Sequence, residues 1–169
     1  PDAAFVVPEQ NVTESNTLNI QFEADAIANI QAMNLSVVVA RSVGSNEDTA
    51  AQTVWAVIPP SEIVAATISL EWDPVEFFAF QSDLTAQIGR IMRPHAQVPV
   101  LLGERYDYDG SHLVANAQGS VNSEQITLEN LASTQVTFGL AASATLGGTD
   151  SGPVAFIVAE AFENGLLTF

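Results

Sequence analysis

Apolar and polar residues alternate with a period of two in several short segments of the chain. Residues 18–22 and 68–72 each place three apolar side chains on one face of an expected strand. Further strand-like segments lie at residues 35–40, 54–58, 98–102, 112–117, 125–131, 136–142 and 154–162. Turn signals separate these segments, among them Pro59-Pro60 and the glycine-rich stretch 146–152, which we expect to be a long flexible turn.

The number of short strands determines the fold class that we expect. Eight or more strands with turns between them are typical of an antiparallel β-sandwich or barrel. We predict an all-β protein with a single antiparallel β-sandwich of the immunoglobulin-like or Greek-key type, which spans residues 1–169 as one domain. The β-branched run at residues 35–40 suits a strand that is buried on both faces.

Two segments depart from the period of two and predict one or two short helices. Residues 25–33 repeat apolar side chains near a period of 3.6, and Asn34 is suited to end that helix. Residues 73–76 combine an acceptor, a proline and a glutamate in an order found at helix starts. The aromatic run at residues 77–80 can equally continue as a strand, so the second helix is one of two alternatives.

Composition changes this picture by exclusion. The chain has no lysine and no cysteine, and twenty acidic residues against four arginines give a formal net charge of −16. Without an amine or a thiol, Schiff-base chemistry, thiolate nucleophiles, zinc-thiolate sites and disulfides are excluded. The negative surface repels phosphates, so we expect no nucleic-acid partner and no electrostatic membrane partner. No apolar run approaches the ~20 residues that a membrane helix needs.

The N-terminal residues show no basic region and no long apolar run, so no signal peptide is visible. This favours a cytosolic protein, as does the lack of cysteine, although a processed, secreted chain would look the same. Asn11-Val-Thr13 and Asn34-Leu-Ser36 both fit the acceptor pattern for N-glycosylation, which also occurs often by chance.

Catalysis has few candidate residues. Only His95 and His112 can supply an imidazole, and Ser111 beside His112 would face the opposite side of a strand. The chain has no Gly-x-Ser-x-Gly motif, and no pair of carboxylates can be singled out among twenty acids. We therefore expect a protein that is not an enzyme.

One acidic constellation suggests a calcium loop. Asp107 and Asp109 are two residues apart and Gly110 follows, but the other ligands of an EF-hand are not in register. The favoured interpretation is a charged hairpin end, with both carboxylates on the solvent face opposite Tyr106 and Tyr108. We expect no metal, with Asp107 and Asp109 as the alternative.

The cations cluster in sequence at Arg90, Arg93, His95 and Arg105. In so acidic a chain they are expected mostly to form internal salt bridges, because a guanidinium pairs well with carboxylates. The alternative is that Arg90, Arg93 or His95 orients the polar or anionic end of a ligand.

Aromatic residues gather in the middle of the chain. In a sandwich they are chiefly core, although rings between two sheets can also line a pocket for a flat, conjugated ligand, and an exposed Trp can stack on a sugar. The candidate ligand-binding residues are Trp55, Trp72, Phe78, Phe80, Tyr106, Tyr108, Arg90 and His95.

Several segments also occur in a recognisable order along the chain. They are Leu18-Asn-Ile-Gln-Phe22, Val54-Trp55, Ile68-Ser-Leu-Glu-Trp72 with residues 77–80, Thr137-Phe-Gly-Leu-Ala141 and Gly152-Pro-Val-Ala155. This order resembles that of small acidic β-sandwich proteins of mushroom fruiting bodies, which include a chromoprotein that holds a small coloured organic compound. The resemblance implies a single sandwich that binds a pigment.

We therefore expect a non-enzymatic protein that binds a small, largely apolar organic ligand, such as a chromophore. Because lysine and cysteine are absent, the ligand would be held without a covalent bond. The alternative is a lectin-like protein that binds carbohydrate, or a self-associating interaction protein that forms homo-oligomers.

Overall fold

The computed structural model of the protein describes residues 15–41, 43–46, 50–82, 91–92, 94, 97–117 and 121–169. These residues form one helix, α1 (Ala24–Ala32), and fifteen strands in four sheets. The protein is thus mainly β, as the alternation of apolar and polar residues predicts. Among the described residues, no helix has the length and apolar character needed to cross a membrane.

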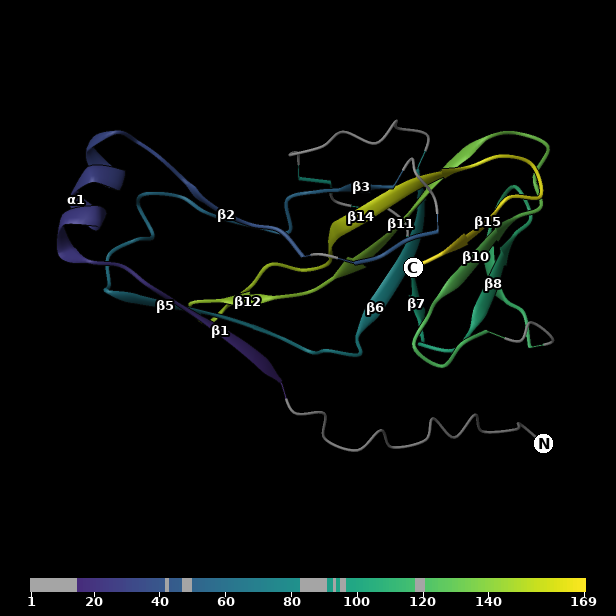
Figure 1. Ribbon diagram of the computed structural model, residues 1–169, viewed down its shortest axis with the longest axis horizontal. Coiled ribbons are helices and arrows are strands. Elements are labelled where there is room, and N and C mark those ends of the chain that lie inside the picture. The colour runs from purple at the N-terminus through teal and green to yellow at the C-terminus, as the bar shows by residue number, and fades with distance from the viewer. Residues whose placement is uncertain are drawn as a thin grey trace, which may run out of the picture.

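Two sheets make up the body of the molecule, on the right of Figure 1. In order, the main sheet contains β3 (Ala51–Gln52), β14 (Val154–Ala161), β11 (Val136–Ala142), β6 (Phe77–Ser82) and β7 (Val98–Val100). The facing sheet contains β15 (Leu166–Thr168), β10 (Thr127–Asn130), β8 (Arg105–Tyr108) and β9 (Leu113–Ala115).

One hydrophobic core joins the main and facing sheets. Phe138 of β11, Phe156 of β14 and Leu128 of β10 are all fully buried in it. The rings of Tyr108 and Phe138, which belong to opposite sheets, meet edge to face with their centroids 5.7 Å apart. Burial of this apolar surface, worth about 25 cal/mol per Å² removed from water, is what holds the two sheets together.

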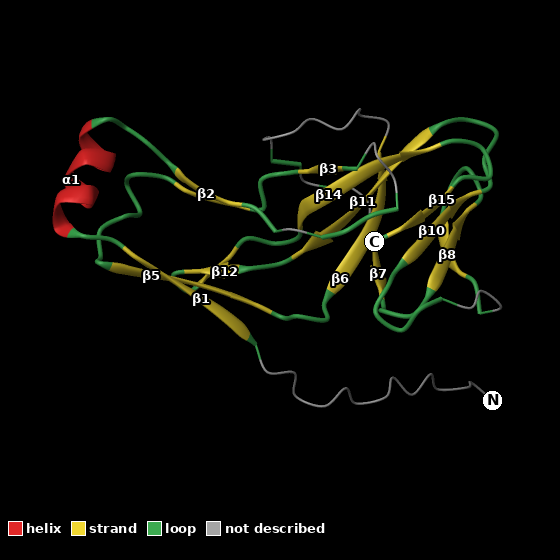
Figure 2. Ribbon diagram, in the orientation of Figure 1, coloured by secondary structure: helices red, strands yellow, loops and turns green. Residues whose placement is uncertain are grey.

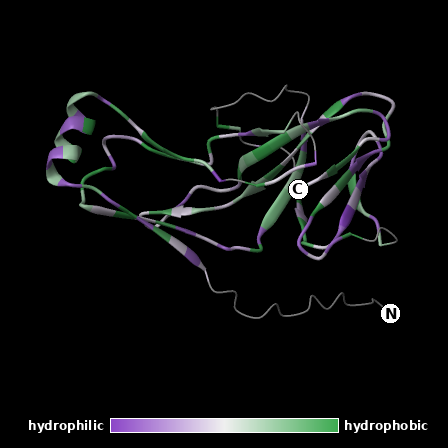
Figure 3. Ribbon diagram, viewed as in Figure 1, coloured by the Kyte–Doolittle hydropathy of each residue, from purple (hydrophilic) through white to green (hydrophobic). Residues whose placement is uncertain are grey.

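The remaining strands form an arm that ends at α1, on the left of Figures 1 and 2. The arm sheet has the order β1 (Asn16–Gln21), β5 (Thr67–Trp72), β12 (Thr145–Leu146) and β13 (Thr149–Asp150). Beside it, β2 (Val37–Val39) pairs with β4 (Ala56–Ile58). A small core around Ile58, Ile63 and Ile68 holds these strands to α1, which carries apolar and polar residues side by side (Figure 3).

The predicted helix at residues 25–33 and its end are confirmed. α1 covers residues 24–32, and Asn34 follows it in the left-handed conformation with φ 53°. Asparagine tolerates this conformation better than most residues because its short side chain costs little there. The predicted strands at 18–22, 68–72, 136–142 and 154–162 are confirmed within one or two residues.

Two local expectations are wrong, and of the two alternatives that the sequence leaves open at residues 73–80 the strand is the one observed. Val38, at the centre of β2, is 60% exposed, so residues 35–40 are not buried on both faces: β2 has β4 as its one strand partner in the described structure. Residues 73–76 form no helix, because the Asp73 carboxylate accepts the Val75 N–H at 2.8 Å and the chain bends directly into β6. Residues 146–152 contain part of the β12–β13 hairpin, which turns at Gly147 and Gly148, both at positive φ.

The expected sheet arrangement also differs from what is observed. Strands β8 and β10 are parallel, with Tyr106 opposite Leu128, so the pairing is not antiparallel throughout. The arm sheet and the β2–β4 pair lie outside the main and facing sheets. What holds is therefore the coarser prediction, a mainly β protein with several mostly antiparallel sheets.

Candidate ligand-binding site

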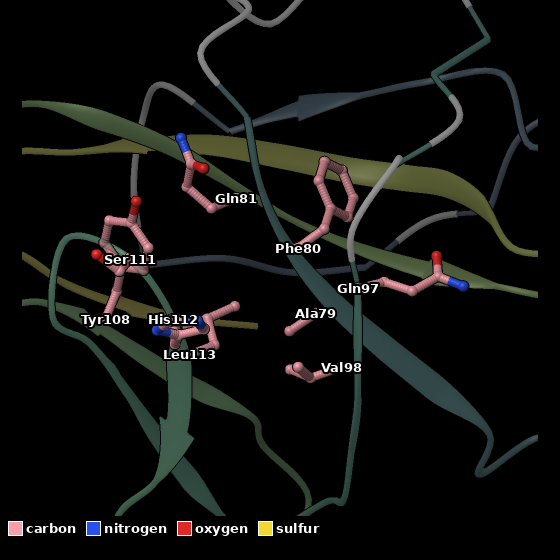
Figure 4. A pocket seen from close by; sticks show the side chains of 9 residues that line it. All are labelled: Ala79, Phe80, Gln81, Gln97, Val98, Tyr108, Ser111, His112 and Leu113. Carbon is pink, nitrogen blue, oxygen red and sulfur yellow. The ribbon is translucent and has the colours of Figure 1, made fainter.

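A cavity of about 170 Å³ lies between the β6–β7 edge of the main sheet and the β8–β9 hairpin of the facing sheet (Figure 4). Two cross-strand pairs form its apolar walls. Ala79 of β6 is paired with Val98 of β7, and Tyr108 of β8 is paired with Leu113 of β9. Paired residues on antiparallel strands point to the same face, so each sheet contributes one matched pair to the cavity.

Polar side chains complete the lining of the cavity. They are Gln81, Gln97, Ser111 and His112. Gln97, Ser111 and His112 are exposed, so the polar groups lie on the solvent side of the apolar walls. Apolar walls with a few polar groups are what a site for a small organic molecule requires.

A turn stabilised by Asp109 brings Ser111 and His112 to this position. The Asp109 carboxylate accepts the N–H groups of Ser111 and His112, both at 2.8 Å. These hydrogen bonds, first that from His112 and then that from Ser111, lower the pKa of Asp109. Gly110 between them has φ 99°, which few other residues adopt. Ser111 and His112 both precede β9, so the alternation expected for two neighbours on a strand does not apply to them, and both line the cavity.

The carboxylates proposed for calcium are engaged by protein groups. One oxygen of Asp107 accepts the Arg105 Nε–H at 2.9 Å, and the other accepts an Asn116 amide N–H at 2.6 Å. Asp109 holds the turn described above. Within the described residues no three His, Asp or Glu side chains are placed to hold a metal ion. Asp109 is exposed, whereas the side chain of Asp107 is only 19% exposed.

The two tryptophans lie outside the cavity. Trp55 is 3% exposed, and its indole N–H donates to the Ala142 carbonyl at 3.1 Å. The half-buried Trp72 meets Trp55 edge to face, with ring centroids 5.5 Å apart. Trp55 is therefore a core residue, with no exposed face on which a sugar could stack.

Tyr106 is also part of the core and not of the cavity. It is 6% exposed, its hydroxyl donates to the Glu104 carboxylate at 2.5 Å, and it accepts the Leu101 N–H at 3.1 Å. Burial, and then the hydrogen bond to Glu104, raise the pKa of Tyr106 to about 12.

Of the eight predicted ligand-binding residues, Phe80 and Tyr108 line the cavity. Phe80 does so only in part, because its ring packs on the other side of the main sheet with Ala51 and Ala141. Phe78 packs on that side too. Arg90 and His95, like Arg93, lie outside the described residues.

The arginines that are described behave in two different ways. Arg105 forms ion pairs with Asp107 and Glu129, as the expectation of internal salt bridges requires. Arg41 forms no ion pair with any described residue; its guanidinium carbon lies 4.9 Å from the ring centroids of Phe77 and Phe156. Burial lowers the pKa of Arg41, and its Nη1 is buried with no hydrogen-bond partner among the described residues. Sequence reasoning missed this contact, because the rings belong to distant strands.

Comparisons with protein-family models, with curated proteins and with solved structures find no match to this chain. The candidate site is therefore interpreted from its own geometry and chemistry.

Proposed function

We propose that the protein binds a small, largely apolar organic ligand without a covalent bond and without catalysis, between two sheets that act as a β-sandwich. The observation that carries this proposal is the cavity, whose walls are the pairs Ala79–Val98 and Tyr108–Leu113. Its opening toward solvent carries an imidazole, a hydroxyl and two amides, which can hydrogen-bond to a hydroxyl or carbonyl of the ligand.

The size of the cavity limits which part of a ligand it can hold. A volume of about 170 Å³ is close to that of an apolar cavity that accepts benzene, and smaller than the ~300 Å³ typical of drug-sized ligands. One aromatic ring therefore fits between the walls, and the rest of a larger conjugated pigment extends from the opening.

The charge of the protein favours a neutral ligand. A formal net charge of −16 repels anions, and among the described residues neither an arginine nor a carboxylate that could pair with a charged ligand lines the cavity. Without lysine or cysteine, the ligand is held by shape and hydrogen bonds. The proposed ligand is thus a neutral aromatic compound with a polar group at one end.

The first test is the visible absorption spectrum of the native protein, followed by mass spectrometry of an organic extract. A colourless protein that releases no compound would rule out a resident pigment. The site itself is tested by titrating p-cresol and following the NMR signals of Leu113 and His112. In L113W the larger ring fills the cavity, so binding is expected to fall at least tenfold.

V114W is the matched control, because Val114 is the next residue on β9, is 56% exposed and does not line the cavity. It is expected to bind p-cresol like the unaltered protein. Equal binding by L113W and V114W would contradict the site, and no binding by the unaltered protein would contradict the proposal.

A second function, self-association, is favoured by an exposed apolar patch at the far end of the body. Leu131, Phe162 and Leu166 are 49%, 64% and 41% exposed. Asn130 holds the loops that carry these three residues together. Its backbone N–H donates to the Gly165 carbonyl, and its side-chain amide donates to the Phe162 carbonyl. A second copy of the chain could bury this patch against its own. Analytical sedimentation should then show a dimer, and F162S should convert the dimer to a monomer. If the unaltered protein is a monomer at all concentrations, self-association is excluded.

A further inference from the structure

The segment Asn34-Leu35-Ser36 fits the acceptor pattern for N-linked glycans, an asparagine with a hydroxyl residue two positions later. It connects α1 to β2 at the outer tip of the arm, at the left end of the molecule in Figure 1. All three residues are exposed, Leu35 to 50%. A transferring enzyme can reach them without unfolding a strand.

The local backbone leaves both acceptor side chains unused. The Asn34 N–H donates to the Gln31 carbonyl at 3.2 Å, and the Leu35 N–H donates to the Ile30 carbonyl at 2.9 Å. This pair of bonds closes the helix with main-chain groups alone. Among the described residues, neither the Asn34 amide nor the Ser36 hydroxyl has a hydrogen-bond partner.

The surroundings of the acceptor are apolar and open. Met33 is 66% exposed and Val64 is 77% exposed. The Gln31 amide donates to the Ile63 carbonyl at 3.0 Å, which holds the loop with Val64 beside the last turn of α1. A glycan attached here would cover apolar side chains that otherwise face water.

We propose that Asn34 is an N-glycosylation site. The Asn34 amide nitrogen forms a bond to the anomeric carbon of an oligosaccharide carried on a polyprenyl diphosphate. The bond between that carbon and the phosphate oxygen breaks, the lipid diphosphate leaves, and the amide nitrogen gives up one proton. Since this transfer takes place outside the cytosol, the proposal implies a secreted or surface-exposed protein. It does not depend on the ligand cavity.

The test is peptide mass spectrometry of the protein purified from the organism that makes it. Treatment with peptide-N-glycosidase in heavy-oxygen water should remove a glycan from the peptide containing Asn34 and leave heavy-oxygen-labelled aspartate. In the same host, N34Q and S36A should lose this glycan, whereas S36T should keep it. The variant N11Q distinguishes a glycan on Asn34 from one on Asn11, the second acceptor asparagine, which lies outside the described residues.

S36A retains Asn34 and its backbone, so loss of the glycan in S36A cannot be attributed to a misfolded helix end. Finding the Asn34 peptide only in its unmodified form in the source protein would overturn the proposal. Equal modification of S36A and S36T would overturn it as well, because the hydroxyl would then have no role.

Discussion

The ring of Phe80 lies directly over the backbone of Gly139, its cross-strand partner on β11. A Cβ atom at position 139 would lie 2.3 Å from Cζ of Phe80 and 2.8 Å from the Ile157 carbonyl oxygen. The main sheet at this point can therefore accept only glycine. Because Phe80 also lines the cavity, this contact fixes the strand that carries Ala79 into it.

We predict that G139A lowers the free energy of unfolding by about 1–3 kcal/mol, because overpacking forces the ring or the backbone to move. Urea denaturation measures the effect. G44A is the control, since a Cβ at Gly44 meets no atom within 4 Å. The double variant F80L/G139A should recover part of the loss. A G139A protein as stable as G44A would contradict the close contact.

A second prediction concerns stability at high pH. Tyr106 has a folded-state pKa of about 12, compared with 10.0 for the free side chain. The protonated hydroxyl is thus favoured in the folded state, and the stability it contributes is complete below pH 10 and is lost as the pH rises toward 12. No lysine or cysteine titrates in this range. The free energy of unfolding should therefore fall between pH 10 and 12.

Absorbance at the tyrosinate wavelength should show one of the two tyrosines titrating near pH 12, and Y106F should remove that step. Y106F should also flatten the decrease in stability between pH 10 and 12, whereas Y108F should leave it in place. If Y106F shows the same pH dependence as the unaltered protein, ionisation of the buried Tyr106 hydroxyl is not the origin of the decrease in stability.

The strands were predictable because the pattern that specifies them is local. Residues 136–142 and 154–161 are almost continuously apolar, and they become the buried central strands of the main sheet. The arm was not predictable, because the alternation at 18–22 does not tell which strand it will meet. Its partner β5 lies nearly fifty residues away, with Ile20 opposite Ile68. The sequence of neither segment identifies a partner strand that is so far away along the chain.

The cavity was only partly predictable for a similar reason. Aromatic character pointed to Tyr108 and Phe80, which do line it. Val98 and Leu113 are ordinary apolar strand residues, and their role arises from two separate cross-strand registers. The Asp109-Gly110 turn could have indicated that His112 projects from a hairpin end, because Asp and Gly together favour tight turns.

A third prediction concerns Arg41, which is surrounded by the rings of Trp55, Phe77 and Phe156. R41K should lower the free energy of unfolding by about 1–2 kcal/mol, because a compact ammonium is more strongly hydrated and cannot stack on the rings. R41M should stay within about 1 kcal/mol of the unaltered protein, because it keeps an apolar stem and removes the unpaired Nη1.

R105M provides the contrast for Arg41. It leaves Asp107 and Glu129 without their ion-pair partner, at 19% and 18% side-chain exposure, and should be the least stable of the three variants. Urea denaturation followed by tryptophan fluorescence gives the order of the free energies of unfolding of the three variants. If the R41M variant unfolds at a lower urea concentration than the R105M variant, Arg41 has an ionic role.

The last prediction concerns Asn130, which is fully buried and joins three loops of the body. Its amide nitrogen donates to the carbonyls of Thr134 at 2.8 Å, Ala161 at 3.2 Å and Phe162 at 3.1 Å. Its side-chain oxygen accepts the Ala132 N–H at 3.0 Å. In N130D, a carboxylate of the same shape would face these carbonyl oxygens with no donor. We expect a loss of about 3–5 kcal/mol at pH 7, the cost of a buried uncompensated charge.

Protonation of the new carboxyl removes its charge and restores one donor, so the deficit of N130D should be smaller at pH 4 than at pH 7. The comparison is with the unaltered protein at each pH, measured by urea denaturation. N122D is the control, because the exposed Asn122 side chain bonds to the other described residues only through its oxygen, which accepts the Glu124 N–H at 3.1 Å, and aspartate keeps that oxygen. Its stability should change by less than about 0.5 kcal/mol. Equal effects of N130D and N122D would show that the Asn130 donors do not hold the loops together.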